Sequence, residues 1–221
     1  MVNIQIGNGI KEQDLDMQDK KKGINIENTS WSFTLDPVHL YAFWNEAFTK
    51  EECDTIVKIA QNKGLMEGAT TGDDPTKSRN SHISWLNPSD NLQWFYERLT
   101  GIAVQLNDDY FKFDLYGINE GLQFTNYKAP SGKYGKHVDK GVNTPVRKLS
   151  ISVQLTNPDE YEGGELCLYD GGMPIETMDK TQGTLVIFPS YVLHEVKPVT
   201  KGERNSLVTW VTGPAFTLCL I

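Results

Sequence analysis

The sequence predicts a mostly β (α+β) protein in which short strands form a sandwich or barrel and helices support it from the N-terminal side. From residue 111 onward, short apolar or alternating segments are separated by turn-forming residues, a pattern typical of antiparallel sheets. Before that point, two segments have apolar residues at helical spacing. At 221 residues the chain is long enough to bury one core. We therefore expect a single domain over residues 31–221, preceded by a polar arm over residues 1–30.

The first ordered elements are expected to be a strand and a helix. Residues 31–35 alternate between apolar and polar side chains, which predicts a strand. Thr49 and Glu52 have the spacing of a capping box, in which each side chain binds the backbone N–H of the other residue. Apolar residues then recur at helical spacing: Cys53, Ile56, Val57 and Ala60. Gly64 is expected to end this helix.

A second helix is expected to begin at Asn87 and Pro88, which suit the N-cap and the first helical position. Its apolar positions would be Leu92, Phe95, Leu99 and Ile102. We expect both helices to pack on the outside of a sheet. Between them, residues 72–80 are rich in turn-forming residues and predict a surface loop.

The remaining chain is expected to form short strands. They cover residues 111–116, 122–127, 136–139, 146–155, 165–169, 184–188, 192–196 and 206–212. Turn-forming sequences separate several of these segments, for example Asn157-Pro158-Asp159 and Gly163-Gly164. The number and shortness of the segments favour a sandwich or barrel over an open sheet.

Composition narrows the class of protein. The formal net charge of −8 does not favour a nucleic-acid-binding surface, which is normally basic. Three widely spaced cysteines, Cys53, Cys167 and Cys219, are typical of reduced thiols and not of a disulfide framework. The first residues lack the pattern of a signal peptide, and no apolar run is long enough to cross a bilayer. We therefore expect a cytoplasmic location and no membrane partner.

The candidate site is built around His137 and Asp139. Residues two apart in an extended segment point to the same side, so an imidazole and a carboxylate would face one way. His194, in another expected strand, is the candidate third ligand. Two histidines and one carboxylate leave coordination positions open, which suits non-haem Fe(II), although zinc or nickel could occupy the same ligands. Ten residues after His194, Arg204 carries a planar cation suited to a carboxylate.

Several short motifs lie between residues 127 and 204: Tyr127, His137-Val138-Asp139, Gly163-Gly164-Glu165, His194-Glu195-Val196 and Gly202-Glu203-Arg204. Together they resemble the Fe(II)/2-oxoglutarate dioxygenases, and most closely the prolyl 4-hydroxylase type. The resemblance extends from about residue 122 to residue 212. It implies a double-stranded β-helix (jelly-roll) core with supporting N-terminal helices. It also implies Fe(II), 2-oxoglutarate and O2 as cofactors, with ascorbate as a further candidate.

The resemblance implies roles for individual residues. The two histidines and the aspartate named above would bind the metal and form the catalytic centre. Arg204 and Tyr127 would bind 2-oxoglutarate, with Gln154 or Thr184 as a further contact to its distal carboxylate. An ion pair with the adjacent Glu203 is the alternative for Arg204.

Four residues would contact the substrate: Tyr134, Arg147, Trp210 and Arg79. Packing in the core is an equal alternative for Trp210. Arg79 lies in the loop of residues 72–80, which by resemblance is either a lid over the substrate or a plain connection. The expected partner is a peptide or protein substrate that contains proline.

Other functions stay open on the sequence alone. An oxygenase of the same superfamily could act on nucleic-acid bases, but that branch has an asparagine four residues after its distal histidine, where this chain has Pro198. An oxygenase of the superfamily could also act on a small molecule. A non-catalytic, cupin-like metal-binding protein is the third alternative. Such a protein would not need Arg204 or Tyr127, so these two residues favour an enzyme.

Overall fold

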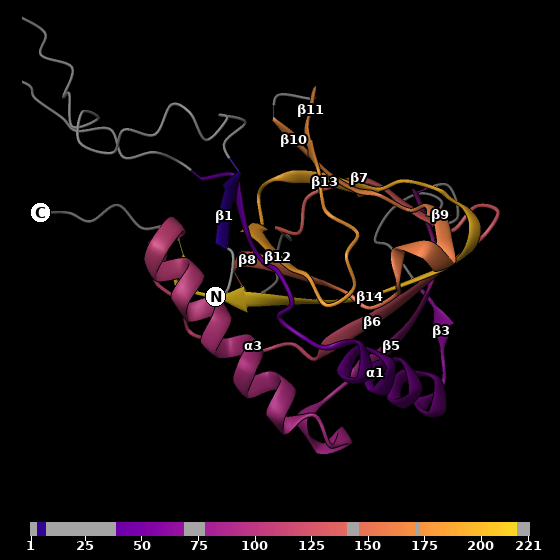
Figure 1. The fold of residues 1–221 in the computed structure, drawn as a ribbon. Coiled ribbons are helices and arrows are strands. Elements are labelled where there is room, and N and C mark those ends of the chain that lie inside the picture. The colour runs from indigo at the N-terminus through magenta and orange to yellow at the C-terminus, as the bar shows by residue number, and fades with distance from the viewer. Residues whose placement is uncertain (1–3, 8–38, 69–77, 141–145, 171–172, 216–221) are drawn as a thin grey trace, which may run out of the picture.

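The computed structural model describes residues 4–7, 39–68, 78–140, 146–170 and 173–215. In this part of the chain two antiparallel sheets lie against each other, and helices cover the outer face of the larger sheet (Figure 1). The predicted fold class, a mostly β jelly roll with supporting helices, is therefore confirmed. The strand predicted over residues 31–35 lies outside the described residues.

In the described chain the larger sheet has nine strands and the smaller sheet has five. The larger sheet runs β1 (Ile4–Gly7), β2 (Tyr41–Trp44), β12 (Leu185–Pro189), β8 (Arg147–Gln154), β14 (Val199–Thr212), β6 (Leu122–Lys128), β5 (His82–Leu86) and β3 (Met66–Glu67), and β9 (Tyr161–Gly163) pairs with β14. The smaller sheet runs β11 (Met173–Thr177), β10 (Leu166–Asp170), β13 (Leu193–Val196), β7 (Lys133–His137) and β4 (Arg79–Asn80).

The two faces of the larger sheet differ in polarity because side chains alternate along each strand. On β8, Ile151 and Val153 belong to the apolar core that the sheet shares with the helices. Their neighbours Ser150 and Ser152 point to the opposite face, where the smaller sheet lies. The same alternation on β14 places Arg204 between the sheets. The space between the sheets is therefore lined by polar side chains.

Both helices pack on the outer face of the larger sheet, as expected. Helix α1 (Lys50–Lys63) begins with the predicted capping box: the Thr49 hydroxyl accepts from the Glu52 N–H at 3.3 Å, and the Glu52 carboxylate accepts from the Thr49 N–H at 2.9 Å. Arg98 of α3 (Gln93–Leu106) also donates to the Glu52 carboxylate, at 2.6 Å, and so joins the two helices. No helix in the described ranges has the length and apolar character of a membrane span.

The strand predicted over residues 111–116 is wrong. Helix α3 continues into a π-helical turn, η3 (Asn107–Phe111), and Lys112 then takes a left-handed conformation with φ 58°. The Asn107 side chain accepts from the Phe113 N–H at 3.0 Å and donates to the Phe113 carbonyl at 2.9 Å. One amide side chain therefore supplies the two backbone bonds that a neighbouring strand would have supplied.

The second helix begins later than predicted. Asn87 and Pro88 start only a single 3-10 turn, η2 (Pro88–Asp90), and Asn91 then takes a left-handed conformation with φ 62° that separates this turn from α3. Of the loop predicted over residues 72–80, residues 72–77 lie outside the described residues. The last two residues of that loop form β4, which pairs with β7.

Gly183 fixes how the loop before α1 meets the sheet, and alanine there is expected to destabilise the fold. Gly183 has φ +83°, and an added Cβ would lie 1.9 Å from the Phe48 carbonyl oxygen. The strained backbone alone costs about 1–3 kcal/mol, so Gly183→Ala should lower the free energy of unfolding by at least that amount. Urea unfolding measures the change.

The matched control is Gly101→Ala, because a Cβ at that helical position meets no atom within 4 Å. Alanine in a helix interior stabilises by about 0.5–1 kcal/mol relative to glycine. Equal stability of the two variants would contradict the role given to Gly183.

Candidate active site

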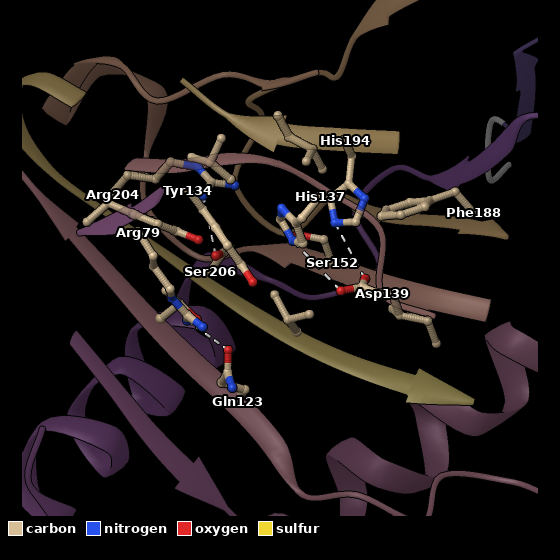
Figure 2. A pocket seen from close by; sticks show the side chains of 16 residues that line it. Arg79, Gln123, Tyr134, His137, Asp139, Ser152, Phe188, His194, Arg204 and Ser206 are labelled. Atoms are coloured by element: carbon tan, nitrogen blue, oxygen red, sulfur yellow. Dashed lines mark hydrogen bonds and ion pairs between the residues drawn. The ribbon is translucent and has the colours of Figure 1, made fainter. Parts of the chain in front are cut away.

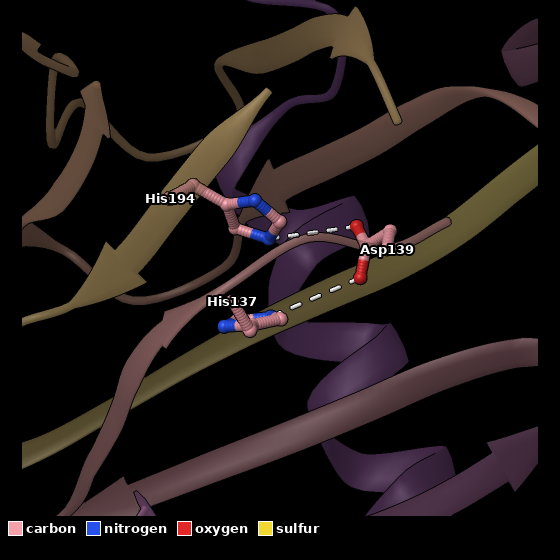
Figure 3. Close-up of side chains that lie close together, drawn as sticks. All are labelled: His137, Asp139 and His194. Atoms are coloured by element: carbon pink, nitrogen blue, oxygen red, sulfur yellow. Dashed lines mark ion pairs between the residues drawn. The ribbon is translucent and has the colours of Figure 1, made fainter. Parts of the chain in front are cut away.

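Three potential metal ligands converge between the sheets (Figure 3). His137 ends β7, Asp139 follows two residues later, and His194 lies on β13 directly opposite His137. The Nε2 atom of His137 lies 3.8 Å from Oδ1 of Asp139, and Nε2 of His194 lies 3.5 Å from Oδ2. All three ligand atoms lie within 4.8 Å of one another, so one metal ion could be bound by all of them.

Backbone carbonyl groups orient both imidazole rings. Nδ1 of His137 lies 2.7 Å from the Gly135 oxygen, and Nδ1 of His194 lies 3.0 Å from the Val192 oxygen. A carbonyl can only accept, so each Nδ1 carries a proton, and in the neutral ring Nε2 keeps the lone pair that can bind a metal. Burial, together with the neighbouring His194, lowers the pKa of His137 to about 4. His137 is therefore neutral at physiological pH, as metal binding requires.

Asp139 is held as a carboxylate although it is buried. Burial opposes its ionisation, but the neighbouring His194 and His137, together with hydrogen bonds from the Ser150 and Trp210 side chains, outweigh this effect and keep the pKa of Asp139 below its usual value. Two imidazoles and one carboxylate form the ligand set of non-haem Fe(II) oxygenases, which leaves coordination positions open. The donor set thus fits Fe(II).

A pocket next to these ligands contains most of the predicted site residues (Figure 2). Arg79, Tyr127, Tyr134, His137, Asp139, His194 and Arg204 all line it. Gln154 and Thr184 line a neighbouring pocket that also contains Arg204. Arg147 and Trp210 line neither of these two pockets. The structure therefore brings together residues from strands that are far apart in the sequence.

Arg204 is 3% exposed and lies beside Tyr127, with its guanidinium 5.5 Å from the centre of the tyrosine ring. Its Nη1 donates to Ser206 at 3.4 Å. No carboxylate among the described residues forms an ion pair with Arg204. Glu203, the alternative partner, pairs instead with Lys128 at 2.8 Å. A buried guanidinium without a counter-ion is costly, so this position suits an anionic ligand.

The surroundings of Arg204 include Gln154 and Thr184, which the sequence singled out, and Tyr161, which it did not. The amide of Gln154 donates to the Tyr161 hydroxyl at 2.8 Å, so Gln154 is already occupied. Burial raises the pKa of Tyr161, with the Arg204 guanidinium opposing it, so Tyr161 stays a neutral phenol. The Thr184 hydroxyl is buried without a hydrogen-bond partner in the described chain and is free for a ligand. At Gly164 a Cβ would lie 3.0 Å from Cδ of Arg204, so the Gly-Gly turn leaves room for this arginine.

Two tyrosines and a second arginine complete the pocket. Burial raises the pKa of Tyr127, which therefore keeps its proton as a hydrogen-bond donor. Tyr134 stacks on His137 with ring centres 3.5 Å apart. Arg79, 6% exposed, lies over the Tyr134 ring and donates to Gln123 at 2.9 Å and to Ser81 at 2.7 Å. The Arg79 guanidinium is thus fixed in the wall of the pocket.

Arg147 and Trp210 lie together near Asp139. Arg147 stacks over Trp210 at 3.6 Å and donates to the backbone oxygen of Asp139 at 3.3 Å. Its guanidinium also pairs with Glu120: Nε donates to Oε1 at 2.6 Å and Nη2 donates to Oε2 at 2.5 Å. Trp210 is only 5% exposed. Their predicted contact with a substrate stays a prediction.

The chain matches the family model described as "2OG-Fe(II) oxygenase superfamily" over residues 122–212. It is 27% identical to a "PKHD-type hydroxylase" of Colwellia psychrerythraea over 161 residues, 71% of each chain. It is 40% identical to a PKHD-type hydroxylase of Alteromonas mediterranea over 93 residues, which cover 39% of this chain and 41% of that relative. The chain thus spans less than half of the second relative.

Solved structures with the same fold include prolyl hydroxylases. A Pseudomonas putida prolyl-4-hydroxylase superposes with a TM-score of 0.63 and 20% identity, covering 80% of this chain and 94% of that chain. A prolyl hydroxylase from Trichoplax adhaerens, in complex with a hypoxia inducible factor peptide fragment, has a TM-score of 0.64 and 17% identity, covering 78% and 83%. These likenesses show a shared jelly-roll fold.

Proposed function

We propose that the chain is a 2OG-Fe(II) oxygenase of the prolyl 4-hydroxylase type and that it hydroxylates a proline within a peptide or protein segment. One observation carries the proposal. The histidine–aspartate–histidine cluster lies in a pocket that also contains Arg204, which is buried and forms no ion pair with a carboxylate of the described residues. A metal site alone would suit a simple binding protein. The buried cation beside it supports an enzyme that binds an organic acid together with the metal.

Fe(II), 2-oxoglutarate and O2 are the cofactors of this family. When bound, the iron and the 2-oxo acid supply the oxidising power for hydroxylation of a C–H bond. The chain's own residues bind and orient the iron, the 2-oxo acid and the substrate. His137, Asp139 and His194 would hold the iron. Ascorbate as a further cofactor stays a prediction.

We assign the far carboxylate of 2-oxoglutarate to Arg204. Its planar fork matches a carboxylate, with two charge-assisted hydrogen bonds. The free hydroxyl of Thr184 lines the same pocket and is the better candidate for a second contact than Gln154, whose amide binds Tyr161. Tyr127, a buried phenol beside Arg204, would donate a further hydrogen bond.

On the substrate side, Arg79 and Tyr134 support a peptide ligand. Both line the pocket that contains the metal ligands, and Arg79 is fixed there by Gln123 and Ser81. A rigid guanidinium can donate to the backbone carbonyl groups that flank a proline. Arg147 and Trp210 would then act closer to Asp139, at the edge of the substrate site.

Arg79→Gln should raise the apparent KM for a proline-containing peptide by about tenfold or more, because it removes a charged hydrogen-bond donor from the pocket wall. Succinate release measured against peptide concentration gives the KM. Arg98→Gln is the matched control, since the Arg98 guanidinium pairs with Glu52 on the helices and should leave the KM unchanged. An unchanged KM in Arg79→Gln would remove Arg79 from the substrate site.

The substrate class itself is tested by mass spectrometry of competing substrates. The enzyme is incubated with proline-rich peptides, free proline and methylated single-stranded DNA, and each is scored by mass: the gain of one oxygen atom marks a hydroxylated product, and the loss of CH2 from the DNA marks an N-methyl group oxidised and released as formaldehyde. The proposal expects gain on the peptides. Oxidation of the DNA with both proline substrates unchanged would overturn it in favour of a nucleic-acid oxygenase. If free proline reacted as well as the peptides, proline hydroxylation would stand as the reaction, but the proposal that the substrate is a peptide would be wrong.

A further inference from the structure

Two buried hydroxyl groups hold one side of the Asp139 carboxylate. The Ser150 hydroxyl donates to Oδ2 of Asp139 at 2.7 Å, and the Ser190 hydroxyl lies 3.0 Å from the Ser150 hydroxyl. Ser150 has a single O–H group, and it donates this hydrogen bond to Asp139. Ser150 must therefore accept from Ser190, and the direction of both bonds follows. The two serines form a chain that ends on the carboxylate.

Both serines are rigidly placed. Each is 0% exposed. Ser150 lies in the middle of β8, paired with Phe188 on β12 and with Trp210 on β14. Ser190 directly follows β12, and its N–H donates to the Lys148 carbonyl at 2.9 Å. The hydroxyl chain is therefore anchored in the centre of the larger sheet.

Asp139 itself lies beyond the end of β7, where strand pairing no longer fixes its backbone. The Ser190 carbonyl takes over this role, because it accepts from the N–H groups of Asp139 at 3.0 Å and Lys140 at 3.1 Å. Ser190 thus binds the aspartate twice: directly through its carbonyl and, through Ser150, by its hydroxyl. These contacts tie a ligand beside the smaller sheet to the larger one.

The two carboxylate oxygens of Asp139 have different surroundings as a result. Oδ2 accepts from Ser150, whereas Oδ1 lies 3.8 Å from Nε2 of His137. We propose that Ser150 and Ser190 are positioning residues that hold the Asp139 carboxylate in its metal-binding orientation and so determine how tightly the metal is bound. The inference rests on the metal site and not on the identity of the substrate.

The test measures metal affinity in the absence of 2-oxoglutarate and substrate, so it is independent of the proline proposal. The full chain is titrated with Mn(II) by calorimetry. Removing a group that orients a metal ligand typically weakens binding by about 10- to 100-fold, and this is the loss expected for Ser150→Ala. Ser190→Ala should lose less, because it acts through Ser150, and the double variant should bind no more weakly than Ser150→Ala.

Thr209→Val is the matched control. Thr209 lies on the neighbouring strand, opposite Ile151, is 2% exposed, and its hydroxyl has no hydrogen-bond partner in the described chain. This variant removes a buried hydroxyl without touching Asp139, so its Mn(II) affinity should equal that of the wild type. Equal weakening in Thr209→Val and Ser150→Ala would overturn the proposal, since it would indicate a general loss of stability.

Two further measurements separate positioning from folding. The thermal unfolding midpoint of the metal-free protein shows whether Ser150→Ala is folded under the conditions of the titration. Ser150→Thr keeps the hydroxyl and should restore most of the lost affinity. A folded Ser150→Ala with wild-type Mn(II) affinity would overturn the proposal. So would a failure of Ser150→Thr to bind more tightly than Ser150→Ala when both variants are folded.

Discussion

Replacing His194 with alanine is expected to abolish 2-oxoglutarate turnover while the chain stays folded. Its Nε2 is one of three ligand atoms that lie within 4.8 Å of one another, and a metal bound by only two of them would be held weakly and oriented poorly. His137→Ala and Asp139→Ala should have the same effect. Succinate release under iron-saturating conditions measures the loss, and circular dichroism checks the fold.

His82→Ala is the control for this series. His82 is exposed on β5 and lines neither of the two pockets, so turnover should not change. Substantial turnover in any one of the three ligand variants, with iron in excess, would remove that residue from the metal site.

Arg204→Met is expected to reduce the affinity for 2-oxoglutarate by about 3–5 kcal/mol, which is at least a hundredfold, because it leaves a buried carboxylate without its cation. Methionine has a similar length, so the loss reports charge more than volume. Arg204→Lys keeps the charge but loses the planar fork and should cost less, about 1–3 kcal/mol. Binding of 2-oxoglutarate to the Mn(II)-loaded protein without O2 measures both changes.

Arg98→Met provides the comparison for this pair, since Arg98 lies on α3 and pairs with Glu52 on the helix surface. Its 2-oxoglutarate affinity should equal that of the wild type. If Arg204→Met binds 2-oxoglutarate as tightly as Arg98→Met does, another residue must hold the far carboxylate, and Thr184 would be the first to test.

Patterns that depend on neighbours in the sequence predicted the fold well. The capping box at Thr49 and Glu52 and the long alternating strand that became β8 needed only local information. The strand expected over residues 111–116 failed because Asn107 satisfied the backbone of Phe113, which no periodicity reveals. Strands β2 and β5 were not predicted, because short apolar runs have no period long enough to distinguish a strand from a helix or a core loop.

The candidate site was predictable where a motif is compact. His137 and Asp139 are two residues apart, and the structure places them together although the strand ends at His137. Tyr161 was missed because it reaches Arg204 only through the pairing of β9 with β14. Ser150 was missed because its meeting with Asp139 depends on how two sheets face each other. The one local signal for Ser150 is the polar alternation of residues 150, 152 and 154 between apolar neighbours.

The alternation along β8 and β14 also has a consequence for protein engineering. Ser152, Ser206 and Val208 line the pocket, while Val153 and Leu207, their immediate neighbours in the chain, belong to the apolar core shared with the helices. A library that randomises only the first set would explore new substrates on an unchanged scaffold. Varying the second set would instead tune heat resistance without touching recognition. Residues that contact the substrate and residues that stabilise the fold are thus neighbours in the sequence, yet the two sets can be varied separately.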